Sequence, residues 1–324
     1  MKDAKHHHVI DVVPHMFNIG IIGNGSQSKR VQKILKKKKL NFFVYKPKKP
    51  FYFEKKNFNI LKQCKIIFIL SPNKTHFSYI KKLYKNRYIF CEKPPSTNII
   101  ELKKLTKLKT QNIFFNFNFR FSFIAKILSK LNNYNLGKLI TINFNIAHGL
   151  AYKKGYKNNW RSVKYKNPLG VLEMVLVHYI DLINYFFKIR KVDSLTLKNY
   201  SNIGNSYDTC KISYILNNDA QASFFGSYSS PYYKNNLFIF KNGYIEQNEK
   251  NISIRGPAIN LNKKGFFIKP KLIKNFKINE IKDYNNSLAE SVNFFLNCYL
   301  KNKKIPVKMF LKALETNKLL FVKK

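Results

Sequence analysis

The chain has 324 residues, of which 45% are hydrophobic and 15% aromatic, with only 12 glycines and 11 prolines. Such a chain can bury the cores of two domains, which excludes disorder throughout its length. The formal net charge of +44 indicates either a polyanionic partner or a compositional bias; because the charge is nearly all lysine spread from end to end, we favour the bias and expect no nucleic-acid partner.

Residues 1–16 hold four of the seven histidines and no folding pattern, so we interpret them as a leader or tag, with Met16 as the natural start. The four cysteines lie far apart, without metal or redox spacing. We interpret them as buried thiols of a cytoplasmic protein and expect no metal site. The longest apolar stretch, 170–187, carries Glu173, His178 and Asp181. Three such side chains are typical of a buried helix, so we expect no membrane partner.

From residue 17 onward, short apolar runs alternate with helical patterns. Strands are expected at 17–23, 40–46, 64–71, 87–94 and 112–121, and helices at 29–39, 77–86 and 98–110. Alternation of this kind is typical of a doubly wound parallel sheet with helices on both faces. The sequence therefore predicts an α/β domain of the Rossmann type over residues 17–122.

The pattern changes after residue 122. Alternating strand-like runs occupy 139–149, 191–200, 208–230 and 237–256, and helical segments are expected at 124–133, 287–300 and 306–320. Asn217-Asn218-Asp219 and Asn242-Gly243 are hairpin-turn signals between such runs. The sequence therefore predicts an α+β domain over residues 123–324, with an open-faced antiparallel sheet and helices.

The first strand is followed directly by a glycine turn and a helix. Gly23 suits the tight turn, and Gly25 lets the backbone approach a pyrophosphate at the helix N-terminus, where free N–H groups bind anions. An ordinary glycine turn is the alternative interpretation. The candidate cofactor contacts of this turn are Gly23, Asn24, Gly25, Ser26, Gln27 and Ser28.

The second strand ends in Lys46-Pro47-Lys48-Lys49, where an acidic residue would hold the ribose 2′-hydroxyl of NAD. A lysine attracts a 2′-phosphate instead. We therefore expect Lys46 to favour NADP over NAD.

Five landmarks follow one another in the chain: the glycine turn, "SPNKTH" at 71–76, "CEKPPS" at 91–96, "NFNFRF" at 116–121, and "NPLGVLEMVLVHYIDL" at 167–182, which is preceded by "NNWRS". In this order they resemble the glucose-fructose oxidoreductase / inositol dehydrogenase (Gfo/Idh/MocA) family over nearly the whole chain after residue 16. The resemblance implies a nicotinamide-dependent oxidoreductase of sugars, cyclitols or nucleotide sugars, with a second domain often used for oligomerisation.

The resemblance also implies roles for particular residues. Lys93, at the carboxyl end of the fourth strand, would face nicotinamide and substrate and stabilise developing alkoxide charge. Glu92 would act on the cofactor side of the site, as an orienting residue. His178 would take the hydroxyl proton, and Asp181, three residues later on the same helical face, would orient the imidazole or hold a substrate hydroxyl. A histidine in an apolar helix is otherwise more often a core residue.

Other matches to the family are shorter. The loop that contains Ser71, Pro72 and His76 matches a family loop near the nicotinamide ribose; the alternative for His76 is a loop cap. The candidate substrate contacts are Asn118, Arg120, Trp160, Arg161 and His178. The alternatives are a surface ion pair for Arg120 and a packing role for Trp160.

One departure from the family stands out: many relatives carry an Asp four residues before the histidine, whereas this chain has Met174 there and Glu173 one place earlier. Either the register slips and Glu173 substitutes, or the third polar group is absent.

The sequence therefore predicts an NAD(P)-dependent dehydrogenase or reductase that acts on a CH–OH group of a sugar or nucleotide sugar, as a homodimer or homotetramer. Two other classes stay open. Met174 suggests a catalytically impaired relative that binds cofactor as a regulatory protein. A contiguous lysine stripe, if present, would indicate a basic nucleic-acid-binding protein.

Overall fold

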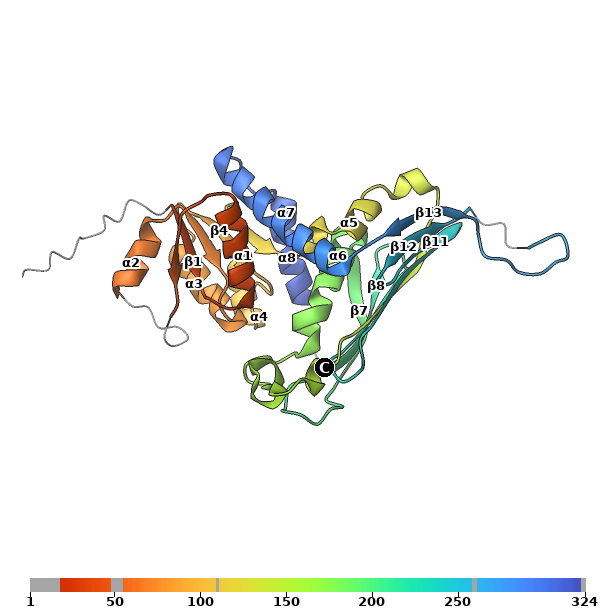
Figure 1. Cartoon of the computed structure of the whole chain (residues 1–324), viewed down its shortest axis with the longest axis horizontal. Helices are drawn as coiled ribbons and strands as arrows, with labels where there is room; N and C mark the ends of the chain where they lie inside the picture. Colours follow the sequence, from red (N-terminus) through yellow and green to blue (C-terminus); the bar gives the residue numbers. More distant parts are fainter. Residues whose placement is uncertain (1–17, 48–54, 109–110, 258–260, 322–324) are drawn as a thin grey trace, which may run out of the picture.

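Two β-sheets of different kinds organise the chain (Figure 1). The computed structural model describes residues 18–47, 55–108, 111–257 and 261–321. The interpretation of residues 1–16 as a leader therefore lies outside the described residues, as do Lys48 and Lys49. Within the described ranges, no helix is long and apolar enough to cross a membrane.

The N-terminal sheet is parallel throughout, with the strand order β2-β1-β3-β4-β5. Its strands are β1 (Ile19–Ile22), β2 (Phe42–Tyr45), β3 (Ile66–Ile69), β4 (Tyr88–Glu92) and β5 (Ile113–Asn116). Strand β1 is apolar and buried along its whole length, as a parallel strand covered on both faces requires. The register aligns the carboxyl ends of the strands, which places the loops after β1, β3 and β4 at one edge.

Helices cover both faces of this sheet, which confirms the predicted doubly wound fold. They are α1 (Ser26–Lys37), α2 (Lys55–Gln63), α3 (His76–Leu83) and α4 (Ile99–Thr106). Helix α1 buries Val31 and Leu35 against one face, in a cluster that includes Phe68 and Phe90. Helix α2 was not expected from the sequence, and residues 118–121, expected to continue the fifth strand, form a 3-10 turn instead.

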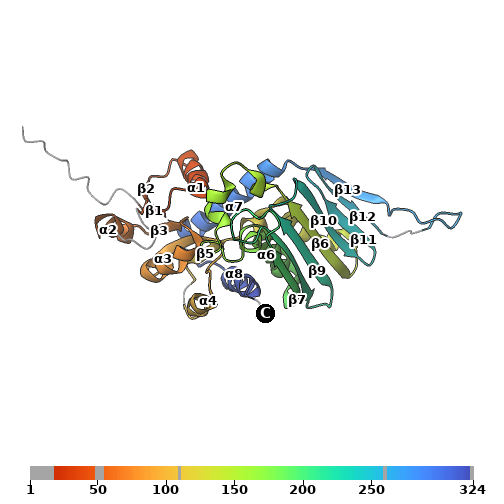
Figure 2. The same cartoon turned by 90° about the horizontal axis from the view of Figure 1, so that it is seen from below.

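The second sheet has eight strands in the order β13-β12-β11-β10-β6-β9-β8-β7 (Figure 2). They are β6 (Leu139–Ala147), β7 (Ile189–Lys198), β8 (Thr209–Leu216), β9 (Gln221–Ser227), β10 (Tyr233–Phe240), β11 (Gly243–Gln247), β12 (Asn251–Arg255) and β13 (Leu272–Lys277). Neighbours are antiparallel except β6 and β9. The predicted hairpins are confirmed, because β8 pairs with β9 and β10 with β11.

Helix α6 (Val177–Phe187) packs on one face of this sheet, where Tyr179 lies with its ring centroid 5.1 Å from that of Phe144 on β6. The short helix α5 (Phe123–Leu128) precedes β6. The chain between β6 and α6 carries a series of short 3-10 turns. Helix α6 thus stands between the two sheets and presents its residues toward both.

The last two helices return to the first domain. The ring of Phe295 on α7 (Glu280–Leu300) packs edge-on, at 5.4 Å, against both Phe68 and Phe90 of the parallel sheet. On the other face, Phe310 of α8 (Val307–Leu319) stacks on Phe115 at 5.8 Å. Residues assigned by the sequence to the second domain therefore complete the core of the first and fasten the two domains together.

Candidate active site

The two glycines of the turn after β1 have different roles. The backbone conformation requires a glycine at Gly23, whereas Gly25 leaves open space in front of the turn. Gly23 has φ +102°, and a Cβ there would lie 2.5 Å from the carbonyl oxygen of Leu70. Gly25 caps α1 in an extended conformation, and a Cβ there would meet nothing within 4 Å. The first turn of α1 contains no acidic residue. Its N-terminus therefore offers N–H groups and open space to an anion.

Side chains hold this turn in place. Ser28 is fully buried and its Oγ donates to the carbonyl oxygen of Gly23 at 2.8 Å, so the serine locks the turn from within. Gln27 Nε2 donates to Glu92 Oε1 at 3.1 Å, and Asn24 accepts from Gln32 at 3.2 Å. Ser26 is exposed at the start of α1. The turn is thus tied to the end of β4.

Lys46 lies at the same edge of the sheet. It directly follows β2 and is exposed, and the N–H of Gly23 donates to the carbonyl oxygen of the preceding residue, Tyr45, at 2.9 Å. The lysine that the sequence associates with a 2′-phosphate is therefore adjacent to the glycine turn.

His76 anchors the loop after β3 through hydrogen-bond contacts to backbone carbonyl groups. The imidazole is fully buried, with Nδ1 2.8 Å from the carbonyl oxygen of Pro94 and Nε2 3.0 Å from that of Ser71. Burial is the main cause that lowers its pKa. Because both ring nitrogens face backbone carbonyls, His76 joins the loops after β3 and β4. Its expected contact with a nicotinamide ribose stays a prediction. Pro72 lies in the same loop, beside Ser71.

Lys93 is a buried amine at the carboxyl end of β4, before a cis peptide bond to Pro94. Its Nζ donates to the carbonyl oxygen of Met174 at 2.7 Å and lies 3.5 Å from that of Glu173. Burial lowers the pKa of Lys93 to about 8; the charge of Glu92 opposes this effect. The residue is therefore poised to exchange a proton near neutral pH.

Glu92 connects three elements through one carboxylate oxygen. In addition to the bond from Gln27, Oε1 accepts from Asn116 Nδ2 at 2.6 Å. Burial raises the pKa of Glu92, while these hydrogen bonds act in the opposite direction. Glu92 thus fixes the end of β4, and with it Lys93, relative to α1 and β5.

His178 lies on α6, with its ring stacked on Phe119 at a centroid distance of 4.7 Å. Its Nδ1 is buried and has no hydrogen-bond partner among the described residues. Burial first, and then the charge of Lys93, lower the pKa of His178 well below its usual value. The imidazole is therefore neutral at physiological pH, and the charge of Lys93 contributes to this state.

The structure does not bring Asp181 to His178. Both oxygens of Asp181 pair with the guanidinium of Arg120, at 2.7 and 2.6 Å, and Thr316 of α8 donates a third hydrogen bond at 3.0 Å. Arg120 also donates to the carbonyl oxygen of Met309 at 2.9 Å. In this buried ion pair the carboxylate of Asp181 faces Arg120 and not the imidazole of His178, and the guanidinium of Arg120 is engaged by Asp181 and Met309. Together they fasten α6 and α8 to the turn after β5.

Two further expected substrate contacts differ in their placement. Asn118 is buried and donates to Ser287 of α7 at 2.8 Å, so it joins elements rather than facing a pocket. Arg161, in the 3-10 turn Trp160–Ser162, stacks on Trp160 at 4.6 Å. Its charge contributes to lowering the pKa of Lys93. The charge of Arg161 therefore acts on Lys93, whereas Asn118 is engaged by α7.

The segment before α6 departs from an ordinary helix. Leu172–Leu176 is a π-helical turn, in which the N–H of Val177 donates to the carbonyl oxygen of Leu172, five residues earlier. The side chain of Met174 is partly buried, with its sulfur 3.6 Å from Asn73 Nδ2. No sequence pattern predicted this turn, which carries the carbonyl group that holds Lys93.

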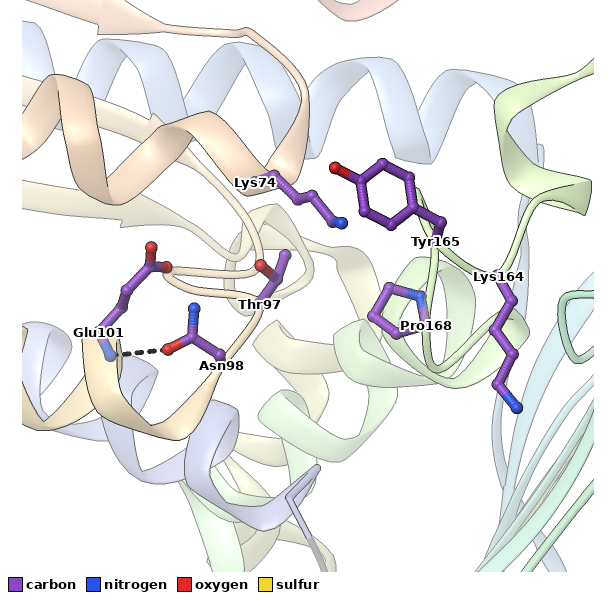
Figure 3. A pocket seen from close by; sticks show the side chains of 7 residues that line it. All are labelled: Lys74, Thr97, Asn98, Glu101, Lys164, Tyr165 and Pro168. Carbon is purple, nitrogen blue, oxygen red and sulfur yellow. Dashed lines mark hydrogen bonds between the residues drawn. The ribbon is translucent and has the colours of Figure 1, made fainter. Parts of the chain in front are cut away.

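Two cavities lie among the described residues, and the lining of neither includes Lys93 or His178. One, of about 420 Å³, lies between the domains and is lined by Lys74, Thr97, Asn98, Glu101, Lys164, Tyr165 and Pro168 (Figure 3). There the ammonium of Lys74 lies 3.5 Å from the ring centroid of Tyr165, which links the loop after β3 to the loop before α6. The other, of about 450 Å³, is lined in part by Phe119, whose ring stacks on His178. Both volumes are in the range of small-ligand sites.

Comparisons with known proteins agree with this arrangement. Residues 26–113 match the model of an oxidoreductase family, Gfo/Idh/MocA, described by its NAD-binding Rossmann fold. Among solved structures, a dehydrogenase from Clostridium difficile is 16% identical, with a TM-score of 0.68 over 93% of this chain and 96% of that one. A myo-inositol dehydrogenase from Corynebacterium glutamicum is 15% identical, with a TM-score of 0.68 over 94% of each chain.

A levoglucosan dehydrogenase in complex with NADH is 12% identical, with a TM-score of 0.75 over 94% of this chain and 95% of that one. No curated protein matches the sequence. The overall two-domain fold of this chain is thus similar to that of these solved structures. The predicted resemblance is confirmed: residues 26–113 match the Gfo/Idh/MocA oxidoreductase family, which is described by its NAD-binding Rossmann fold, and the fold of nearly the whole chain is similar to those of the solved dehydrogenases.

Proposed function

We propose that this protein is an NAD(P)-dependent oxidoreductase that transfers a hydride between nicotinamide and a hydroxyl- or ketone-bearing carbon of a sugar or nucleotide sugar. The observation that carries the proposal is the buried position of Lys93 against the turn that leads into His178. Lys93 is bonded to the carbonyl group of Met174, in the turn leading to His178, and its charge reaches the imidazole. A buried amine and a neutral imidazole at the carboxyl edge of a doubly wound sheet suit the oxidation of an alcohol.

The residues at the glycine turn fit a dinucleotide. The space beside Gly25 and the uncharged first turn of α1 suit a pyrophosphate. We propose that the residues of this turn, with Lys46, Ser71, Pro72 and Glu92, hold the cofactor. When bound, the nicotinamide would supply the hydride acceptor or donor.

The proton chemistry belongs to the chain itself. We propose that the neutral imidazole of His178 accepts the hydroxyl proton during oxidation. The ammonium of Lys93 donates a hydrogen bond to the same hydroxyl oxygen and stabilises the charge that develops there. Arg161 and Trp160 border the substrate in this proposal, and Asp181 acts only by positioning α6. The names of the myo-inositol and levoglucosan dehydrogenases support a polyhydroxylated substrate.

We propose that NADP is preferred, because Lys46 is exposed beside the glycine turn where an acid would repel a 2′-phosphate. Fluorescence titration with NADPH and NADH tests this. The Lys46→Asp variant should lose affinity for NADPH much more than for NADH. Lys65→Asp is a matched control, because Lys65 is also exposed but precedes β3 at the opposite edge of the sheet. Equal binding of both nucleotides would refute the preference, and binding of neither would refute the oxidoreductase proposal.

The same proposal covers domain organisation and assembly. Residues 17–122 would bind the cofactor and residues 123–324 the substrate. The four cysteines are free and buried, which supports a reducing cytoplasmic location. Helix α6 packs on one face of the second sheet. We propose that the opposite face forms the interface of a homodimer or homotetramer, and light scattering after size-exclusion chromatography would measure the mass of the assembly.

A further inference from the structure

Glu173 is a buried carboxyl group that the proposed chemistry does not use. Its side chain belongs to the π-helical turn Leu172–Leu176 and the residue is only 1% exposed. In a regular α-helix of 3.6 residues per turn, residues five apart point about 140° away from each other. A π-helical turn accommodates one more residue. From this geometry we expect the angle around the helix axis between Glu173 and His178 to be smaller than in a regular α-helix.

The contacts of this turn converge on Lys93. The ammonium nitrogen lies 2.7 Å from the carbonyl oxygen of Met174 and 3.5 Å from that of Glu173. On the other side, Glu173 Oε1 accepts a hydrogen bond from the N–H of Leu169 at 3.2 Å, which fixes the carboxyl group. The backbone of the π-turn thus holds the amine, while its acidic side chain stays buried nearby.

We propose that Glu173 is a positioning residue: its π-helical turn holds the amine of Lys93 through backbone carbonyl groups, and its buried carboxylate adds to that of Glu92 a second counter-charge that favours the ammonium form of Lys93 in the active site. The inference rests on the proposed function for its catalytic meaning. A buried ammonium is costly unless an opposite charge or hydrogen bonds compensate it. The π-turn supplies an opposite charge, from Glu173, and hydrogen-bond acceptors, from its carbonyl groups. Although Met174 stands where many relatives have an Asp, Glu173 provides an acidic group in the same turn.

The surrounding charges give the direction of the effect. Lys93 is faced by Glu92 and Glu173, which favour its ammonium form, and by Arg161, which opposes it; its own charge reaches His76 and His178.

Glu173 is faced by Lys93 and Lys74, and its charge reaches Tyr228. Burial raises the pKa of Glu173 to about 7 and lowers that of Lys93 to about 8. Between these values both groups are charged. Removal of the carboxylate therefore lowers the pKa of Lys93 further.

The test measures the protonation of Lys93 without cofactor or substrate. Dilute acetic anhydride labels free amines, and peptide mass spectrometry gives the extent of acetylation at Lys93 as a function of pH. In Glu173→Gln, which keeps an acceptor for the N–H of Leu169, the midpoint should move down by about one unit. Glu173→Asp should restore part of the shift. Glu246→Gln, on β11 in the other sheet, should leave the midpoint unchanged.

A midpoint that does not move in Glu173→Gln overturns the proposal. If circular dichroism finds that variant unfolded, Glu173→Met, an apolar replacement of similar length, is measured in its place with the same expectation. In the active enzyme, the pH profile of kcat should move in parallel, with little change in KM. Absence of nucleotide binding would refute the proposed function, whereas the acetylation result would still decide the pairing of Glu173 with Lys93.

Discussion

Replacement of Asp181 by Asn should destabilise the protein far more than it alters cofactor binding. Asp181→Asn keeps the shape of the side chain but leaves the guanidinium of Arg120 buried without its counter-charge. The two side chains are 0% and 2% exposed. Breaking a buried pair in this way costs about 3–5 kcal/mol, which is a large part of the roughly 5–15 kcal/mol that stabilises a domain.

The chain offers a control ion pair on the surface. Lys126 and Glu290 also pair at 2.6 Å, but their side chains are 54% and 42% exposed. Glu290→Gln should therefore cost at most about 1 kcal/mol. The shortest nitrogen–oxygen distance is 2.6 Å in both pairs, but the buried pair also has a second bond from Arg120 and one from Thr316, so the comparison measures burial and these added hydrogen bonds together.

Urea unfolding followed by circular dichroism measures the difference. With a denaturant dependence of about 3 kcal/mol per molar urea, a loss of roughly 4 kcal/mol lowers the midpoint by about 1.3 M. NADPH titration at low urea should give nearly the wild-type affinity. If Asp181→Asn unfolds within about 0.3 M of the Glu290→Gln control, the pair does not have the structural role that we assign to it. Loss of turnover at unchanged stability would instead make Asp181 catalytic.

Three other substitutions test the site. Gly25→Ala should change the free energy of unfolding by less than about 1 kcal/mol but weaken NADPH binding, because the added methyl group enters only the open space of the turn. Gly23→Ala should instead cost about 1–3 kcal/mol in thermal or urea unfolding, since φ is +102°; equal stabilities of the two variants would contradict this contrast. Lys93→Met should lower kcat by about 10²–10³-fold with nearly unchanged nucleotide affinity, and full activity would exclude Lys93 from the chemistry. Gly170→Ala should lower the free energy of unfolding by about 3 kcal/mol, because the added Cβ would lie 1.8 Å from the carbonyl oxygen of Tyr207. A wild-type melting temperature would contradict this and would show that the loop before the π-turn can shift to make room for the methyl group.

Local sequence patterns predicted most of the secondary-structure elements of the first domain, the glycine turn and the position of Lys93. The apolar run before Gly23 and the helix after Gly25 predicted the strand, turn and helix that the structure contains, because backbone hydrogen bonding and side-chain periodicity act over a few residues. The position of Lys93 followed in the same way, since residues at the ends of parallel strands reach one edge of the sheet.

The roles of the remaining polar residues depended on partners far away in the chain. Asp181 shares a helical face with His178 by spacing, yet its charge is taken up by Arg120, 61 positions earlier. His76 proved to be an anchor because Pro94, 18 residues later, presents a carbonyl group to it. Spacing along a helix states which face a residue occupies, but not what packs against that face.

The same limit explains the C-terminal helices and the π-turn. Amphipathic patterns predicted two helices near the end of the chain, but only packing decided that Phe295 and Phe310 complete the core of the first domain. The extra residue of the π-turn leaves no local signal, because the turn is held by Lys93, 81 positions before Met174. Sequence alone determined the elements and their order; tertiary contacts determined which buried charges meet, since pairing energies depend on distance in space and on exclusion of water.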